Sequence, residues 1–397
     1  MKKKKKTIRD VEVRGKRVLL RVDFNVPVDE SGSITDDTRI RAAIPTIRYL
    51  RDEGAVVLVA SHFGRPKGKP DAAFSLARAA ERLSSLIGFR VPILSDCIGD
   101  EVKRAVSAMK PGDVALLENV RFHPGEEKND RSFAKALAEN ADLFVNDAFG
   151  AAHRAHASTA GVAEFLPAVA GFLMEREVET LSELLESPQR PFAAVLGGAK
   201  VSDKIAVLQN LVERADVLVL GGGMANTFLR AKGHSMGRSL VEEDRIPVAC
   251  EVMSRAAARG TEVLLPVDLV VAERIDPNAE TRVVDVGSVP EGWAAVDIGP
   301  KSAALFARSI ASARTVFWNG PMGVFEIDKF AAGTLSIAGS IAESGATSVV
   351  GGGDSVAAVE KANVAGKMSH VSTGGGASLE FLEGKELPGV ACLMDAR

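Results

Sequence analysis

The chain has 397 residues, of which 46% are hydrophobic and 25% charged, and a formal net charge of −3. This composition excludes a disordered or fibrous protein, and the length suits roughly two to three globular domains. The sequence has no run of roughly 18 apolar residues that could span a membrane and no apolar signal peptide at its start. We therefore expect a soluble cytoplasmic protein without a membrane partner.

Two features of the composition have plain interpretations. The three cysteines, Cys97, Cys250 and Cys392, are isolated in the sequence, which predicts free thiols in a reducing compartment. Residues 2–6 are all lysine, but no aromatic residues alternate with them, and a basic chain end is most often a solvated tail. We therefore expect no nucleic-acid partner.

Charge is uneven along the chain. Residues 1–171 hold 28 Lys and Arg against 23 Asp and Glu, whereas residues 172–397 hold 21 against 29. A basic half inside an acidic protein predicts a small anionic ligand on that side.

Short apolar runs alternate with helical patterns throughout, which is typical of parallel βαβ units. The first runs occupy residues 17–22, 55–61, 113–118 and 142–147. Residues 171–191 then show apolar residues at helical spacing, closed by Pro188 and Pro191, which predicts a connecting helix. The later runs occupy residues 192–198, 216–223, 262–268, 315–321, 347–353 and 369–376. The predicted fold class is α/β, with two doubly wound parallel-sheet (Rossmann-like) domains joined by a hinge helix.

Polar and cationic residues follow the runs of the first half, where ligands of open parallel sheets bind. They are Asp23, Asn25, His62, Arg65, Arg121 and Arg154, with Arg39 at the point where a loop enters a helix. Each alone is best explained as an ordinary surface residue. Together they predict a site for a small polyanion, because arginine binds carboxylate and phosphate with paired hydrogen bonds.

Glycine-rich turns follow the runs of the second half. They read "LGGAKVSDK", "LGGGM", "WNGPMG", "GGGDS" and "STGGG". Glycine lets backbone N–H groups point at a phosphate, although close packing of a helix on a strand also selects glycine. Five such turns predict a nucleotide cleft lined by backbone.

The turn "GGGDS" lacks the lysine of a P-loop. Lys200 and Lys204 are spaced i, i+4, which predicts that they share one face of a helix just after a strand and replace that lysine. Asp354 suits Mg²⁺, which is usually held by one or two carboxylates and the substrate phosphates. His153 and His156 have the spacing of a metal pair, but without a third ligand nearby we expect them to position the substrate or the loop.

The chain resembles the phosphoglycerate kinase family from end to end. The matching stretches are "RVDFNVP", "SHFGRP", "ENVRF", "AHRAHAST", "LGGAKVSDK", "LGGGMANTF", "DIGPK", "WNGPMGVFE", "GGGDS" and "STGGGASLE". The resemblance implies reversible transfer of the acyl phosphate of 1,3-bisphosphoglycerate to Mg·ADP, which gives 3-phosphoglycerate and ATP. It also implies a monomer.

The resemblance assigns a role to each matching residue. The residues that would bind the triose substrate are Asp23, Asn25, Arg39, His62, Arg65, Arg121 and Arg154. The residues that would bind the nucleotide are Lys200, Lys204, Gly222, Gly223, Asn319, Glu326, Gly351, Gly352, Gly353, Asp354 and Ser355. Of these, Asp354 would also bind the metal. Arg39, Lys200, Gly353 and Gly375 would face the phosphoryl group in flight.

The implied domain plan has four parts. Residues 1–171 would bind the triose, residues 172–191 form the hinge, residues 192–380 bind the nucleotide, and residues 381–397 return to the first domain. One departure from the family is Ala295, where glycine is common beside the adenosine. Two alternatives stay open: an NAD-dependent dehydrogenase, although no strand is followed by a true G-x-G-x-x-G, and a non-catalytic nucleotide-binding protein.

Overall fold

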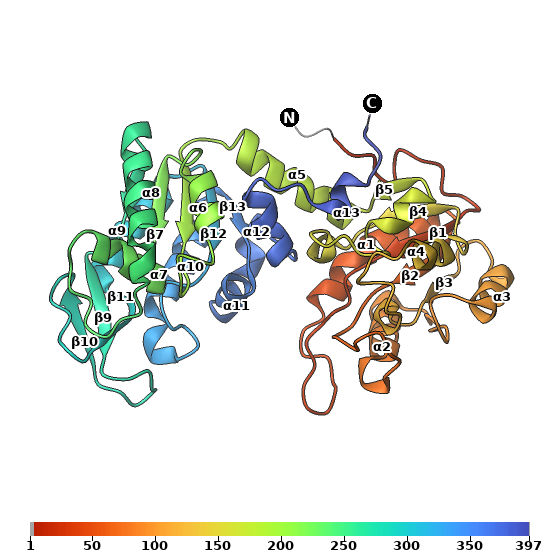
Figure 1. Ribbon diagram of the computed structural model, residues 1–397, viewed down its shortest axis with the longest axis horizontal. Helices are drawn as coiled ribbons and strands as arrows, with labels where there is room; N and C mark the ends of the chain where they lie inside the picture. Colours follow the sequence, from red (N-terminus) through yellow and green to blue (C-terminus); the bar gives the residue numbers. More distant parts are fainter. Residues whose placement is uncertain (1–3, 397) are drawn as a thin grey trace. The chain divides into compact units, whose positions relative to one another are not determined.

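The computed structural model describes residues 4–396, which divide into two compact units. One unit takes in Met1–Glu179 and Glu386–Arg397, and the other Thr180–Lys385. The boundary falls inside helix α5 (Phe172–Glu186), which lies within the helix predicted between residues 171 and 191. Figure 1 labels the elements of each unit.

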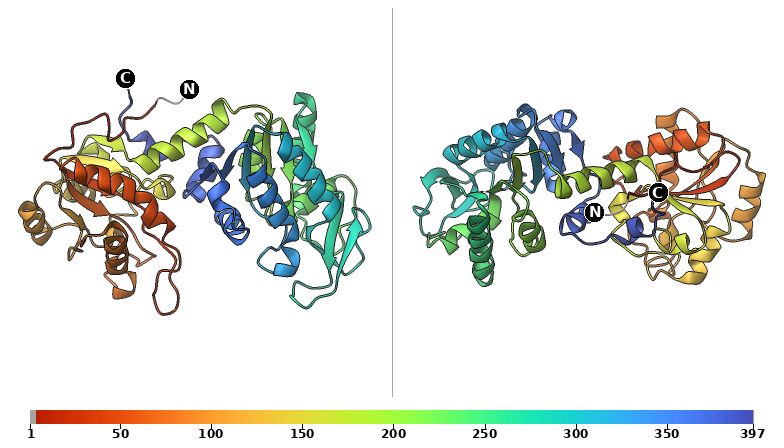
Figure 2. Two further views of the ribbon diagram at one scale, coloured as in Figure 1. Left: turned by 180° about the vertical axis from the view of Figure 1, so that it is seen from behind. Right: turned by 90° about the horizontal axis from the view of Figure 1, so that it is seen from above.

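The first unit is built on a five-stranded parallel sheet in the order β3-β2-β1-β4-β5. Because the strand order reverses at β1, right-handed crossovers place helices on both faces (Figure 2), and buried strands require apolar sequences. The strands are β1 (Arg17–Arg21), β2 (Val56–Ala60), β3 (Val114–Leu116), β4 (Leu143–Asn146) and β5 (Ala168–Ala170). The helices besides α5 are α1 (Thr38–Asp52), α2 (Ala77–Ile87), α3 (Asp100–Ala108), α4 (Arg131–Ala138) and α13 (Pro388–Ala391).

Both ends of the chain belong to the first unit. Ala396 N–H donates to Lys4 C=O at 2.7 Å. The Lys5 ammonium donates to Leu393 C=O at 2.9 Å and to Asp395 Oδ1 at 2.8 Å. The predicted solvated tail is therefore wrong for Lys5, because the C-terminal residues supply acceptors for it, whereas the Lys4 side chain is exposed as predicted. The first three residues of the tail lie outside the described residues.

The second unit is built on a six-stranded parallel sheet in the order β14-β13-β12-β6-β7-β8. The strands are β6 (Phe192–Leu196), β7 (Val217–Leu220), β8 (Glu262–Leu264), β12 (Thr315–Asn319), β13 (Thr347–Val350) and β14 (His370–Val371). The helices are α6 (Ile205–Leu211), α7 (Gly222–Ala231), α8 (Ile246–Arg259), α9 (Pro300–Ser312), α10 (Ala332–Glu343), α11 (Gly353–Lys361) and α12 (Gly376–Leu382).

A small antiparallel sheet in the second unit was not predicted. It has the order β10-β9-β11, from β9 (Asp268–Ala272), β10 (Thr281–Asp285) and β11 (Ala294–Ile298), and lies at one end of the unit in Figure 2. Most of β10 is exposed, so its sequence lacks the apolar run of a buried strand. The two parallel sheets of the predicted fold class are present, and this third sheet adds a wall to the ligand site described below.

Candidate active site

A buried arginine that the sequence analysis missed organises the ligand end of the first sheet. Arg21 ends β1 and is 1% exposed. Its Nε donates to Ser158 Oγ at 2.8 Å, and that hydroxyl donates to Glu126 Oε1 at 2.6 Å. Its Nη2 lies 3.0 Å from His62 Nδ1. Glu126 is fully buried as well, and its negative charge, together with that of Asp23, compensates part of the cost of burying Arg21.

His62 follows β2 and is a neutral hydrogen-bond donor. Because arginine can only donate, the contact with Arg21 makes Nδ1 the acceptor and leaves the ring proton on Nε2. Burial lowers the pKa of His62 well below 6.5, and the surrounding positive charges lower it further. Those charges belong to Arg21, Arg121, Arg154 and Arg39. The ring therefore stays neutral at physiological pH, with four arginines near it.

Arg39 is tied to the loop after β1. Its Nη1 donates to Asp23 Oδ2 at 3.1 Å and to Asn25 C=O at 2.9 Å. Asn25 Oδ1 in turn accepts Gly64 N–H at 2.9 Å, which joins the loops after β1 and β2. These bonds use one of the three guanidinium nitrogens of Arg39 and fix its orientation.

The other three predicted arginines differ in their surroundings. Arg121 is 5% exposed, donates from Nη1 to Gly64 C=O at 2.8 Å, and has Nε 3.3 Å from Glu127 Oε1. Arg154 is half-buried and donates from Nε to His153 Nε2 at 3.2 Å. Arg65 is exposed. The structure thus gathers Arg121 and Arg154 around His62, while Arg65 stands at the surface.

His156 belongs to the same cluster. Burial lowers its pKa to about 4, and the charges of Arg121 and Arg154 add to the shift. Its Nδ1 lies 3.9 Å from Glu126 Oε1, and its backbone N–H donates to Thr159 Oγ1 at 3.1 Å. This is a neutral ring held in a loop beside a buried carboxylate.

In the second unit a lysine occupies the point between β6 and β12 where the strand order reverses, a usual ligand position in doubly wound sheets. Lys204 Nζ donates to Gly197 C=O at 2.6 Å and to Asn319 C=O at 3.0 Å. Burial lowers its pKa to about 8, although Asp354 and Asp203 oppose that shift. The ammonium group therefore joins the two strand ends.

The prediction that Lys200 and Lys204 share a helix face is wrong. Helix α6 begins at Ile205, so both lysines precede it, and Lys200 is exposed. The reason lies in the loop, where Ser202 donates its N–H and Oγ–H to the two carboxylate oxygens of Glu242 at 3.0 and 2.5 Å. This anchor holds the segment in turns until α6 starts.

Several strand-end glycines serve close packing. Gly222 has φ +66°, and a Cβ there would lie 2.7 Å from Gly198 C=O. Its N–H donates to Met322 C=O at 3.0 Å. A Cβ on Gly223 would lie 2.5 Å from Ala199 C=O. At these positions the absence of a side chain lets two loops touch, so close packing explains the glycines.

The "GGGDS" turn is locked to the end of β12. Gly352 has φ +89°, and Asn319 Nδ2 donates to Gly351 C=O at 2.7 Å. Ser355 is fully buried and accepts Gly320 N–H at 2.5 Å. Asn319 and Ser355 therefore hold the turn in place, in addition to any contact with a ligand.

The start of two helices is open. Helix α11 begins at Gly353, and Gly375 precedes α12 with φ +51°. A Cβ at either position would meet nothing within 4 Å. Both helix N-termini thus present backbone to open space, which suits an anion.

A pocket of about 470 Å³ opens beside these loops. Four predicted residues line it, together with Gly198 and Ala295; the four are Gly222, Gly223, Glu326 and Asp354. The other predicted nucleotide residues are not on its wall, namely Lys200, Lys204, Asn319, Gly351, Gly352, Gly353 and Ser355. Leu240 and Ile275, 48% and 63% exposed, form an apolar rim suited to a nucleobase.

Asp297 is a wall residue of this pocket that the sequence analysis missed. It is 3% exposed and accepts Gly333 N–H at 2.6 Å and Ile298 N–H at 2.9 Å. Burial raises its pKa to about 7, since these two bonds only partly offset the loss of water.

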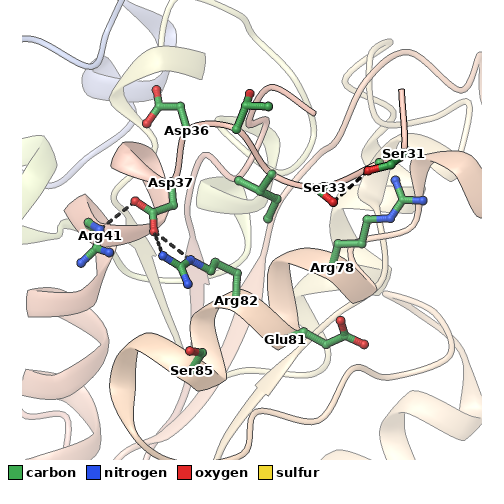
Figure 3. A pocket seen from close by; sticks show the side chains of 12 residues that line it. Ser31, Ser33, Asp36, Asp37, Arg41, Arg78, Glu81, Arg82 and Ser85 are labelled. Carbon is green, nitrogen blue, oxygen red and sulfur yellow. Dashed lines mark hydrogen bonds and ion pairs between the residues drawn. The ribbon is translucent and has the colours of Figure 1, made fainter. Parts of the chain in front are cut away.

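A second pocket, of about 690 Å³, lies between the loop after β1 and helix α2 (Figure 3). Asp37 there binds both Arg41 and Arg82, at 2.7 Å from the Arg41 Nε and 2.8 Å from the Arg82 Nε. The lining has three arginines and three acids, so its charges cancel; they are Arg41, Arg78, Arg82, Asp36, Asp37 and Glu81. This pocket gives no reason to expect an anion.

An arginine cluster in one doubly wound unit and a glycine-walled pocket in the other are the parts of a phosphoryl-transfer enzyme. The phosphoglycerate kinase family model matches residues 8–385. Phosphoglycerate kinases of Moorella thermoacetica and Chloroflexus aggregans are each 59% identical, over 391 and 397 residues, covering 98% and 99% of this chain and 99% of each relative. The solved phosphoglycerate kinase of Coxiella burnetii superposes with TM-score 0.90 at 45% identity, and that of Pyrococcus horikoshii with 0.83 at 36%, each covering 98% of both chains.

The chain therefore belongs to the phosphoglycerate kinase family. The comparisons give no support to the dehydrogenase alternative. Within the described residues, no helix has the length and apolar character that a membrane crossing requires.

Proposed function

We propose that the chain transfers the acyl phosphate of 1,3-bisphosphoglycerate to ADP, reversibly, giving 3-phosphoglycerate and ATP. The observation that carries this proposal is the gathering of Arg21, Arg39, Arg121 and Arg154 around the neutral ring of His62. Such a cluster suits a ligand with several negative charges. A triose with a phosphate and a carboxylate or acyl phosphate is of this kind.

The reaction needs no general base. The nucleophile is an ionised phosphate oxygen of ADP in one direction and the ionised carboxylate of 3-phosphoglycerate in the other. Catalysis then consists of aligning the groups and stabilising charge on the transferring oxygens. His62 and His156 both have lowered pKa values, which makes their rings weak bases. This agrees with a mechanism that needs no general base.

In the first unit we assign two kinds of contact. His62 Nε2–H, Arg65, Arg121, Arg154, Asp23 and Asn25 hold the triose. Arg39 presents its remaining guanidinium nitrogens to the phosphoryl group in flight, because its contacts with Asp23 and Asn25 fix its orientation. A charged group in this role stabilises the transition state more than the ground state.

In the second unit the nucleotide base would lie along Leu240 and Ile275, with its phosphates toward the start of α11. Lys200 and the backbone at Gly353 and Gly375 would contact the transferring group. Asp354, an exposed carboxylate on the pocket wall, fits a hard cation. Mg²⁺ bound there with the nucleotide would neutralise phosphate charge.

Closure completes the proposal. Triose and nucleotide bind different units, so transfer requires them to be brought together and shielded from water, which would hydrolyse the acyl phosphate. We expect residues 172–191 and the segment after residue 380 to act as the hinge. We further expect a monomer that works in the cytoplasm.

The decisive experiment mixes the protein with Mg·ATP and 3-phosphoglycerate and traps acyl phosphate with hydroxylamine. We expect hydroxamate to form with Mg²⁺ and to disappear when Mg²⁺ is chelated. A protein that binds both ligands, by calorimetry, but forms no hydroxamate would be a non-catalytic nucleotide-binding protein, and the proposal would fail.

A further inference from the structure

Three side chains with different metal-binding chemistry converge in the first unit, away from the arginine cluster. They are Asp96, Cys97 and His123, and one donor atom of each lies within 4.8 Å of the other two. Asp96 and Cys97 lie in the loop before α3, while His123 follows the 3-10 turn Val120–Phe122. In the sequence, Cys97 is an isolated thiol with no cysteine or histidine close to it.

The backbone around these residues is fixed. The loop runs beside β3, where Leu94 N–H donates to Leu116 C=O at 2.8 Å. Cys97 N–H donates to Asp96 Oδ1 at 2.6 Å. The His123 ring stacks on Phe133 with ring centroids 5.0 Å apart. The three donors are therefore already brought together, and little ordering remains to be done on binding a ligand.

The Asp96 carboxylate is the centre of the group. His123 Nε2 lies 2.7 Å from Asp96 Oδ1, and the same oxygen accepts the backbone N–H of Cys97 at 2.6 Å. Two hydrogen-bond donors thus point at one acceptor. A divalent cation can bind the Asp96 carboxylate, the His123 ring nitrogen and the Cys97 sulfur once the thiol loses its proton.

We propose that Asp96, Cys97 and His123 bind a thiophilic divalent cation of the Zn²⁺ type. Thiolate, imidazole and carboxylate are the three ligand types that Zn²⁺ accepts, and solvent would supply the fourth ligand. Zinc–ligand bonds of about 2.0–2.3 Å place tetrahedral ligand atoms roughly 3.2–3.7 Å from one another. Donor separations of up to 4.8 Å would therefore shorten by about 1 Å, while His123 Nε2 and Asp96 Oδ1, now 2.7 Å apart, would separate by about 0.5 Å. On binding, the thiol proton goes to solvent and a sulfur–metal bond forms.

Burial gives the site one protected ligand and two accessible ones. Cys97 is 0% exposed, whereas the side chains of Asp96 and His123 are 45% and 26% exposed. A cation can therefore enter from the side of Asp96 and His123. The thiol also sets the site apart from Asp354, because Mg²⁺ prefers oxygen ligands and keeps several waters.

Cobalt titration tests the proposal, since a Co²⁺–thiolate bond has a near-ultraviolet charge-transfer band. The reduced full-length protein, without nucleotide, is titrated with Co²⁺. We expect one equivalent to produce that band together with tetrahedral visible bands, Zn²⁺ to abolish both, and excess Mg²⁺ to leave them. Cys97→Ser should remove the charge-transfer band. The exposed Cys250 provides a matched control, and Cys250→Ser should leave the band unchanged.

Variants of the accessible ligands keep the proposal falsifiable if Cys97→Ser does not fold. His123→Gln and Asp96→Asn should each weaken Co²⁺ binding at least ~10-fold. Replacing a residue that only hydrogen-bonds to a metal ligand already costs about 10-fold in affinity, so losing a ligand should cost no less. The proposal is overturned if Co²⁺ gives no charge-transfer band, if the band persists in Cys97→Ser or disappears in Cys250→Ser, or if His123→Gln and Asp96→Asn bind Co²⁺ like the parent.

Discussion

The two units build the ligand ends of their sheets by different means. The first unit brings charged side chains to its sheet end, where Arg21, the last residue of β1, is linked through Ser158 to the buried acid Glu126. The second unit brings backbone to its sheet end, with glycine wherever two loops touch and Lys204 between the strands. The difference teaches that a similar parallel-sheet plan can supply positive charge through side chains or through N–H groups.

The two designs should also fail differently. Removing Arg39 or Arg65 from the first unit is expected to take away a proposed ligand contact while the fold remains. Adding a methyl group to a closely packed glycine of the second unit should force loops apart and destabilise the unit. Any effect on ligand binding would then be indirect. The predictions below test this contrast.

The largest effect is expected from Gly320→Ala. Gly320 has φ +95°, and a Cβ there would lie 2.3 Å from Gly197 C=O and 2.4 Å from Lys204 Nζ. Strain and overpacking should lower the free energy of unfolding by about 4 kcal/mol. Both tryptophans, Trp293 and Trp318, lie in the second unit, so urea unfolding followed by tryptophan fluorescence measures that unit directly.

The control for Gly320→Ala is Gly339→Ala, in helix α10. A Cβ on Gly339 would meet nothing within 4 Å, and alanine favours a helix, so the variant should be as stable as the parent or slightly more. Equal stability of the two variants would refute the close-packing explanation.

A smaller effect concerns Asp297 and pH. The carboxyl group has a pKa of about 7 in the folded unit against 3.8 when unfolded, so the folded state binds the extra proton. Its contribution should therefore lower the free energy of unfolding as pH rises from about 4 to about 7, by roughly 3 kcal/mol. Asp297→Asn should remove this decrease of the free energy of unfolding with pH, even if the substitution also changes the stability at every pH. An unchanged slope in the tryptophan-monitored unfolding of the variant would contradict the assignment.

Arg39→Ala should act on catalysis. We expect kcat to fall at least ~10²-fold, about 2.7 kcal/mol, while KM for 3-phosphoglycerate changes little. Arg41→Ala, two residues further along α1, removes an arginine that pairs with Asp37 and should leave kcat within a few-fold of the parent. If Arg39→Ala instead raised KM and kept kcat, Arg39 would be a binding residue and Lys200 the better candidate for the catalytic cation.

Asp354→Asn should have a smaller effect than Gly320→Ala, Asp297→Asn and Arg39→Ala. We expect KM for Mg·ATP to rise ~10-fold, about 1.4 kcal/mol, because one carboxylate ligand of a partly hydrated cation is lost. KM for 3-phosphoglycerate should not change, since that ligand belongs to the first unit. Asp203→Asn, an exposed acid outside the pocket wall, is the control. A parallel rise in both KM values would show that the two units do not divide the ligands as proposed.

The sequence predicted the two parallel sheets because buried strands need continuous apolar runs. It did not predict the antiparallel sheet β10-β9-β11, and the lack of a buried apolar run explains the miss only for β10, because β9 is mostly buried. Arg21 was missed although it stands inside an apolar run, where a charge is itself a sign of a buried partner. Ser158 and Glu126, the groups that balance Arg21, come from distant parts of the chain, and only the fold brings them together. The helix start after Lys204 likewise depends on Glu242, 40 residues beyond Ser202.

The meeting of the chain ends has a consequence for biosynthesis. The first unit needs residues from both ends, because Asn146 Nδ2 donates to Gly389 C=O at 2.9 Å and Ala396 pairs with Lys4. The second unit is one continuous stretch, Thr180–Lys385. On the ribosome the second unit can therefore complete its core while the first still waits for its last residues, although the first was synthesised earlier. A circular permutant opened between Lys385 and Glu386 would make the first unit continuous and allow it to complete its core before the second.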